Sequence, residues 1–351
     1  MPNPTATPSK PPMSGGKKIL FGCLGCFGLA AILVIVGVVL FFHWLNETTT
    51  PVPAEALLGP DTVEIVVVQP DADDKGVVEF VRSLGQQIDK DHPGAIDPKL
   101  REGMKRLKKN DASEIFLAFL PMTYAKVSTS GPLKDASGAV EFFSFSHYAN
   151  PIRRVGAKAA EEASSSSTPS GDATVWSHAK GDKTEAIVFD ANHVLRGDDP
   201  KTVGDALDRV RAWKGTSAAT GLVKELRDHL AARPDVWGLL VNEGEAASRE
   251  FEFLEGLPVS SAEVIGIAWE LDVQGSDKAT GRFHLKCRDK AVANALGRAL
   301  VDRSEQVRQA LKDEQEMEAT FTQRVDGEWV VVDFELRDLA KRVIKAMSDG
   351  K

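Results

Sequence analysis

Few residues of this 351-residue chain stand at spacings that carry chemistry. Asp190 and His193 are close in sequence, and a serine from elsewhere in the chain would complete a Ser-His-Asp triad. No G-x-S-x-G elbow, glycine-rich phosphate loop or H-E-x-x-H helix accompanies them. We therefore expect no catalytic residue, and we expect that the protein is not an enzyme.

Two groups of residues resemble parts of metal sites. Asp71, Asp73 and Asp74 match half of a calcium loop, but the spaced glycine and the terminal glutamate are missing, so we expect a turn that caps the next helix. His284 and Cys287 form an isolated H-x-x-C that alternation places on opposite faces of a strand, whereas structural zinc needs four clustered ligands. The sequence predicts neither a metal nor a cofactor.

Charge excludes one class of partner and leaves one basic surface. The net charge of −8 argues against nucleic acid, which needs a concentrated basic face. One predicted helix, residues 98–109, is basic and could bind anionic lipid headgroups or an acidic polymer of the cell envelope. The alternative is that its cations favour a helix C-terminus and remain solvated. These cations are Arg101, Lys105, Arg106, Lys108 and Lys109.

The apolar run Ile19–Phe42 predicts a transmembrane helix that would bind the lipid bilayer. It carries no charge, and as a helix it would rise roughly 36 Å, enough for a bilayer core of about 30 Å. Lysines precede the run and acidic residues follow it, which predicts a cytoplasmic N-terminus and a C-terminal region outside the cytoplasm. A cleaved signal peptide is the main alternative, although its apolar segment would be shorter.

Small residues mark the first half of this run. Gly22, Gly25 and Gly28 would let two such helices approach closely, so a homo-oligomer is one expectation. The alternative is that small residues are merely tolerated in lipid. An association face of this kind is also the only route by which the short tail before the run could take part in signalling.

Beyond the run, the chain predicts a stalk and two similar repeats. We expect a disordered tail over residues 1–18, the transmembrane helix over 19–42, a stalk over 43–60, and repeats over 61–214 and 215–351. Each repeat begins with a Pro-Asp step before an apolar strand, TVEIVVVQ in the first and VWGLLVNE in the second. The expected element order in each is β-α-β-β-α-β-β-α, which predicts an α+β fold of mostly antiparallel sheets packed with helices.

Several local expectations follow from periodicity. One strand is expected around residues 114–129 and another around 139–146, and hairpins at 173–190 and 317–334, the second around Asp326-Gly327. The Ser-rich stretch 164–171 reads as a loop, and residues 336–347 read as a closing helix with apolar residues at helical spacing. The core is expected to include five tryptophans that fall within predicted strands or helix ends: Trp176, Trp213, Trp237, Trp269 and Trp329.

Part of the chain resembles a known type of protein. TVWSHAKGDKTEAIVFDANHVLRGDDPKTVGDALDRV followed by RPDVWGLLVN, and later FHLKCRDKAVANALGRAL, are similar to segments of an uncharacterised bacterial family of single-pass, membrane-anchored envelope domains. The resemblance implies a location and a fold, and no activity.

Together these observations predict a membrane-anchored, extracytoplasmic binding or scaffolding protein of the bacterial envelope, with another envelope protein or a second copy as partner. One alternative is a transmembrane sensor or regulator that acts through helix association. The other is a hydrolase-like enzyme with an unrecognised site.

Overall fold

The computed structural model describes residues 50–91, 102, 111–119, 122–131, 133, 138–146, 149–180, 183–242, 257–315 and 318–338. Within these ranges no helix is both long and apolar enough to span a lipid bilayer. The longest, α9 (Lys290–Gln315), carries charged residues along its length. This finding corrects the prediction of a single-pass membrane protein with a signal anchor, and the run Ile19–Phe42 itself lies outside the described residues.

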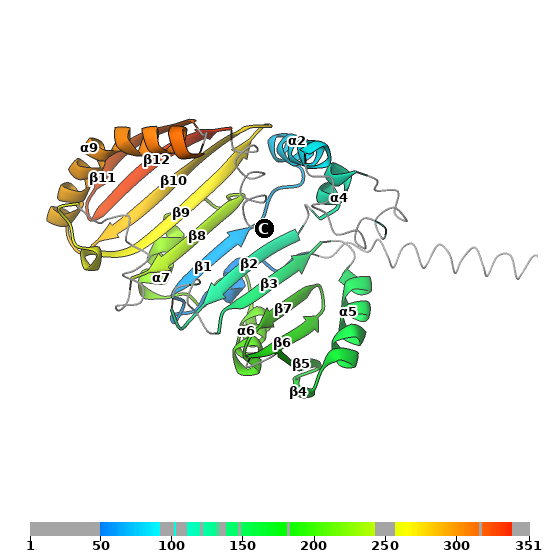
Figure 1. The fold of residues 1–351 in the computed structure, drawn as a ribbon. Helices are drawn as coiled ribbons and strands as arrows, with labels where there is room; N and C mark the ends of the chain where they lie inside the picture. Colours follow the sequence, from blue (N-terminus) through cyan, green and yellow to red (C-terminus); the bar gives the residue numbers. More distant parts are fainter. Residues whose placement is uncertain are drawn as a thin grey trace, which may run out of the picture. The chain divides into compact units, whose positions relative to one another are not determined.

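Twelve strands form one antiparallel sheet, which dominates the structure (Figure 1). Its strand order is β11-β12-β10-β9-β8-β1-β2-β3-β7-β6-β5-β4. The strands are β1 (Glu64–Val68), β2 (Met122–Ser128), β3 (Val140–Phe145), β4 (Ser166–Ser170), β5 (Ala173–Lys180), β6 (Lys183–Asp190), β7 (His193–Gly197), β8 (Val236–Val241), β9 (Val264–Gln274), β10 (Lys278–Cys287), β11 (Glu318–Asp326) and β12 (Trp329–Arg337).

The expected α+β fold of two helix-packed repeats is wrong. The two strands that open the predicted repeats, β1 and β8, pair with each other, from Glu64 opposite Leu240 to Val68 opposite Val236. Because each is apolar on both faces, neither can serve as an exposed edge, and their pairing joins the two halves into one sheet. Counted outward from this pair, β1-β2-β3-β7-β6 and β8-β9-β10-β12-β11 follow the same chain order, and β5 and β4 extend the first side.

The few helices lie on different faces and edges of the sheet. Val330 and Val331 are neighbours on β12 and must face opposite ways; Val330 packs in a cluster with residues of α9, and Val331 in a cluster with residues of α7. Figure 1 accordingly shows α9 in front of the sheet and α7 behind it. The remaining helices are η1 (Ala54–Leu57), α2 (Lys75–Asp91), α4 (Ala112–Phe119), α5 (Ala149–Ala163), α6 (Pro200–Ala212), α7 (Gly221–Asp228) and η3 (Ser261–Glu263).

Three local predictions differ from the structure. The segment expected as one strand over 114–129 is a helix, α4, followed by β2. The Ser-rich stretch expected as a loop contains β4, which pairs with β5 at the sheet edge. The closing helix expected from residue 336 starts too early, because β12 continues to Arg337. Pairing with a neighbouring strand stabilises β4 and the end of β12, and local periodicity does not report such pairing.

One glycine in the centre of the sheet has a packing role. Gly238 on β8 lies opposite Trp269 on β9, and a Cβ atom at this position would stand 2.7 Å from Cε2 of the indole. Gly204 on α6, by contrast, has nothing within 4 Å of its ideal Cβ position.

We therefore predict opposite effects for the same substitution at these two positions. Gly238→Ala should lower the free energy of unfolding by about 2 kcal/mol, because the indole must move in a packed core. Gly204→Ala should raise it by about 0.5–1 kcal/mol, because alanine favours a helix interior. Urea unfolding of both variants measures this, and equal effects at the two positions would contradict the packing described for Trp269.

Candidate ligand-binding cleft

A cleft of about 640 Å³ lies among the described residues. It lies where β1, β2 and β3 meet the loop before α2 and the segments that follow α6 and α7. Its lining mixes apolar rings with polar and acidic groups, as is common in ligand sites. The lining residues are Pro51, Pro53, Glu55, Gln69, Pro70, Asp71, Ala72, Asp73, Met122, Thr123, Ser146, Trp213, Ala232 and Arg233.

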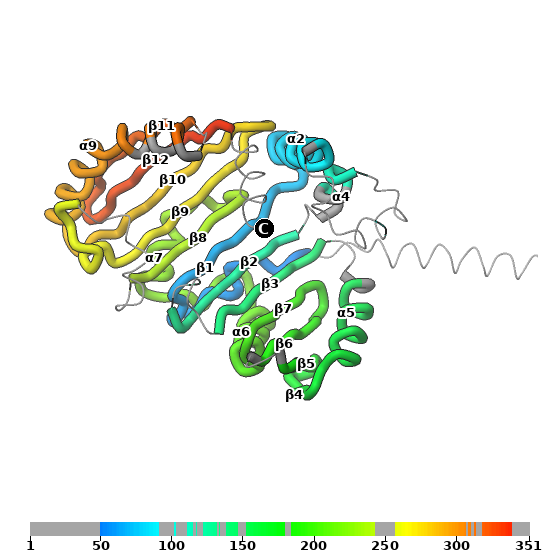
Figure 2. Tube along the Cα trace, viewed as in Figure 1, coloured from blue at the N-terminus to red at the C-terminus, as the bar shows by residue number. Residues whose placement is uncertain are grey.

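One wall of the cleft is the first described segment of the chain, which Figure 2 shows in blue leading into β1. This segment contains η1, whose Ala54 and Leu57 are fully buried together with Leu58. They pack in one cluster with apolar residues of α6, α7 and the central strands. Burial of these side chains holds the wall against the sheet, at roughly 25 cal/mol for each Å² of apolar surface removed from water.

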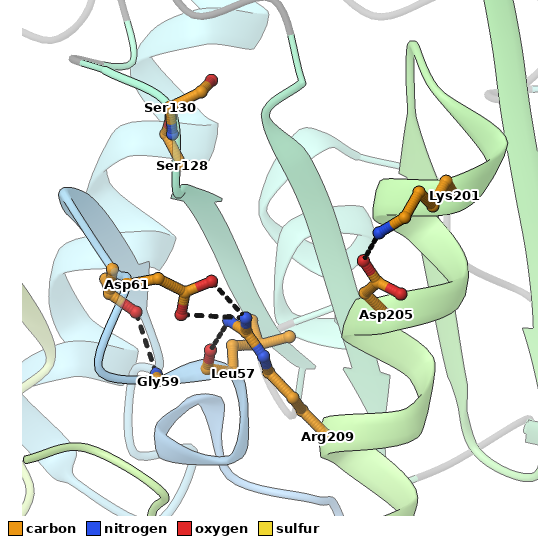
Figure 3. Close-up of polar contacts among 9 residues, drawn as sticks. Leu57, Gly59, Asp61, Ser128, Ser130, Lys201, Asp205 and Arg209 are labelled. Atoms are coloured by element: carbon orange, nitrogen blue, oxygen red, sulfur yellow. Dashed lines mark hydrogen bonds and ion pairs between the residues drawn. The ribbon is translucent and has the colours of Figure 1, made fainter.

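Arg209 of α6 fixes the turn that follows η1 (Figure 3). Its Nη2 donates to both carboxylate oxygens of Asp61, at 2.9 and 2.6 Å, and its Nη1 donates to the Leu57 carbonyl at 3.4 Å. A Cβ atom at Gly59 would lie 2.6 Å from Oδ1 of Asp61, so a larger residue there would displace the carboxylate from this clamp. The two-pronged geometry of arginine with a carboxylate fixes direction as well as distance.

Arg227 of α7 holds η1 from the other side. Its Nη2 donates to Oε1 of Glu55 at 2.6 Å, and the two side chains are only 15% and 16% exposed. The guanidinium also lies over the Trp237 ring, 4.9 Å from the centroid, where the π-face attracts a cation. Glu55 lines the cleft, so this ion pair positions a cleft residue directly.

A row of polar side chains crosses one end of the sheet beneath the cleft. Thr123 on β2 lies opposite Ser144 on β3, which lies opposite His193 on β7, which lies opposite Asp190 on β6. Partners in antiparallel pairs project to the same face, so these four side chains form one row. Thr123 lines the cleft, and Ser144 and His193 are buried behind it.

The row brings together a serine, a histidine and an aspartate, but not in triad geometry. Nε2 of His193 is 3.6 Å from Oδ2 of Asp190, and Oγ of Ser144 has no hydrogen-bond partner among the described residues. Burial raises the pKa of the Asp190 carboxyl, but the hydrogen bond from Arg211 at 2.7 Å and the nearby His193 hold it below its ordinary value. Burial lowers the pKa of His193, against the opposing effect of Asp190. A nucleophile aligned with His193 is therefore missing from this row.

The acidic loop at the cleft rim, which contains Asp71, Asp73 and Asp74, caps the start of α2. Oδ1 of Asp74 accepts the backbone N–H of Gly76 at 2.6 Å and that of Val77 at 3.2 Å. Oδ1 of Asp71 accepts the N–H of Asp73 at 2.9 Å. Such bonds satisfy donors that a helix leaves unpaired at its first turn. Among the described residues, no group of three His, Cys, Asp or Glu side chains could hold a metal ion.

A second, smaller cavity of about 320 Å³ lies over β9, β10, β11 and β12. Charged residues that line it are held in ion pairs: Nε of Arg282 is 2.5 Å from Asp333, and Arg324, outside the lining, also bonds Asp333. Glu335 of the lining pairs with Lys278, also outside it, at 2.8 Å. Because these charges satisfy each other at a solvated surface, the cavity offers less to a ligand than the cleft does.

The remaining residues singled out in the sequence have different outcomes. Both surfaces predicted from the sequence lie outside the described residues. They are the glycine face, with Gly22, Gly25 and Gly28, and the basic helix, with Arg101, Lys105, Arg106, Lys108 and Lys109. Cys287 is a free, fully buried thiol, and burial raises its pKa to about 11. Of the cleft residues, Asp71 and Asp73 had been noticed as part of a turn before a helix, and Trp213, half-buried just after α6, as a core residue. The others were missed because no short motif links them.

His284 is a buried histidine on β10, away from the cleft. It is 4% exposed, neither ring nitrogen has a hydrogen-bond partner among the described residues, and His229 and Trp329 pack around it. Burial, followed by the charges of Arg282 and His229, lowers its pKa from 6.5 to about 4. The folded protein therefore resists a proton that the unfolded chain accepts.

The low pKa of His284 makes the folded protein less stable at acidic pH. The contribution of neutral His284 to the free energy of unfolding is fully present above pH 6.5 and is lost as the pH falls towards 4. The loss amounts to about 2 kcal/mol between pH 7 and pH 5. His284→Phe should remove this part of the pH dependence, and His178→Phe, at an exposed position, should leave it unchanged. Urea unfolding at both pH values measures it; an unchanged pH dependence in His284→Phe would show that His284 is not the group responsible.

Comparison with known proteins adds no identification, because no family model, curated protein or solved structure matches the chain.

Proposed function

We propose that the protein is a non-catalytic binding or scaffolding protein of the bacterial envelope, and that its ligand occupies the cleft. The observation that carries the proposal is a cavity of about 640 Å³ lined by Trp213, three prolines and polar side chains. Asp71, Asp73 and Arg233 line it, and none of them forms an ion pair within the described ranges. Polar groups placed around an apolar wall orient a ligand.

Two other functions remain proposals with less support. A hydrolase would need a nucleophile aligned with His193, but Oγ of the neighbouring Ser144 has no hydrogen-bond partner among the described residues and so does not bond His193. A sensor acting through helix association rests on Gly22, Gly25 and Gly28, which lie outside the described residues. The location outside the cytoplasm and the resemblance to an envelope family also stay predictions from the sequence.

Photocrosslinking in intact cells tests the proposal. The photoreactive residue p-benzoylphenylalanine would replace Ala72, which lines the cleft, or Ala159, which is exposed on α5. We expect a discrete adduct from position 72 and none of the same mass from position 159. Adding Trp213→Ala should reduce the adduct at position 72 several-fold, because the ligand loses an aromatic contact.

The same experiment can refute the proposal. No adduct at position 72, or equal adducts at both positions, would show that the cleft is not a binding site. An adduct at position 72 that Trp213→Ala leaves unchanged would place the contact on the outer surface of the loop.

A further inference from the structure

Two buried polar atoms beside the cleft have no hydrogen-bond partner among the described residues. They are Oγ of Ser144 and Nε2 of His193, on side chains that are 0% and 5% exposed. An unbonded buried polar atom costs about 1–3 kcal/mol, and in native proteins such atoms normally bond to protein, water or a ligand. Two in adjacent positions therefore call for a common partner.

The position of these atoms relates them to the cleft. Ser144 is the cross-strand neighbour of Thr123, which lines the cleft. Ser146, the next residue along the chain that projects to the same side as Ser144, also lines it. The hydroxyl of Ser144 thus lies between two lining positions, with His193 directly beyond it on β7.

The inner end of the cleft, at Ser144 and His193, carries no net charge. Arg211 already neutralises Asp190 through its bond at 2.7 Å, and burial lowers the pKa of His193, so its imidazole is uncharged at pH 7. A charged ligand group would lie here in a buried place without a counter-ion, which is costly. A hydroxyl can donate to one orphaned atom and accept from another, so it fits.

The outer part of the cleft suits the same kind of ligand. Trp213 offers a half-buried aromatic surface against which the C–H face of a ring can pack. Asp71, Asp73 and Arg233 offer planar groups that bond pairs of hydroxyls. Glu55 is paired with Arg227, so the rim leaves the carboxylates of Asp71 and Asp73 against the guanidinium of Arg233, which disfavours an anionic ligand.

We propose that the cleft binds a neutral polyhydroxylated ligand of the saccharide class, and that one of its hydroxyls reaches Ser144 and His193 between Thr123 and Ser146. This proposal rests on the proposed function and specifies its ligand. In this proposal the sugar ring packs against Trp213, and its outer hydroxyls bond to the carboxylates of the rim. The innermost hydroxyl bonds to Ser144 and His193.

An array of neutral glycans probed with the full chain tests the proposal, followed by affinity measurement on the strongest glycan. Ser144→Ala should weaken binding about 5- to 20-fold, because the inner hydroxyl loses a partner. Ser177→Ala, at a buried serine on β5 away from the cleft, should leave the affinity unchanged. Trp213→Ala should weaken binding more than 10-fold, as a second and independent variant.

Failure of this inference and of the proposed function are distinguishable. No binding to any neutral glycan, or an affinity that Ser144→Ala leaves unchanged, would overturn the inference. If the photocrosslinked adduct at position 72 still forms in that case, the cleft binds another class of ligand. If neither the adduct nor glycan binding occurs, both proposals are wrong.

Discussion

The ion pair between Glu55 and Arg227 is the interaction on which the cleft depends. It joins the first described segment to α7 at 2.6 Å, with both charges largely withdrawn from water. Removing one partner of such a pair leaves the other buried and unpaired, at a cost of about 3–5 kcal/mol. Arg227 also donates to the Ala231 and Ala232 carbonyls, so the pair fixes two walls of the cleft together.

The continuity of the sheet provides the other constraint. Because β1 pairs with β8, the ends of both halves meet, and Asp235 lies beside the loop that bears Asp71, whose N–H it accepts at 3.2 Å. Burial, together with nearby Asp272 and Asp74, raises the pKa of Asp235, although backbone bonds act against this. Two separate sheets would have placed this loop and the segment after α7, which bears Ala232 and Arg233, on different bodies. A single sheet places both around one cleft.

The elements that could be predicted from sequence are those with a strong local signal. The hairpins β5-β6 and β11-β12 were predicted because alternation and turn residues specify them. The edge strand β4 could not be predicted, because SSTPS is polar and pairs only through its backbone. The cleft was equally invisible: Glu55 and Arg227 are 172 positions apart, and no motif spans such a distance.

Amide hydrogen exchange over residues 51–62 tests the central claim most directly, namely that this segment is fixed on the sheet as a wall of the cleft. In the structure, the N–H groups of Ala56, Leu58 and Thr62 donate to carbonyls of the same segment, and the apolar side chains beside them are buried. The account predicts exchange as slow as that of β1. Exchange at the rate of an unprotected peptide would contradict it, since the cleft would then have no fixed wall.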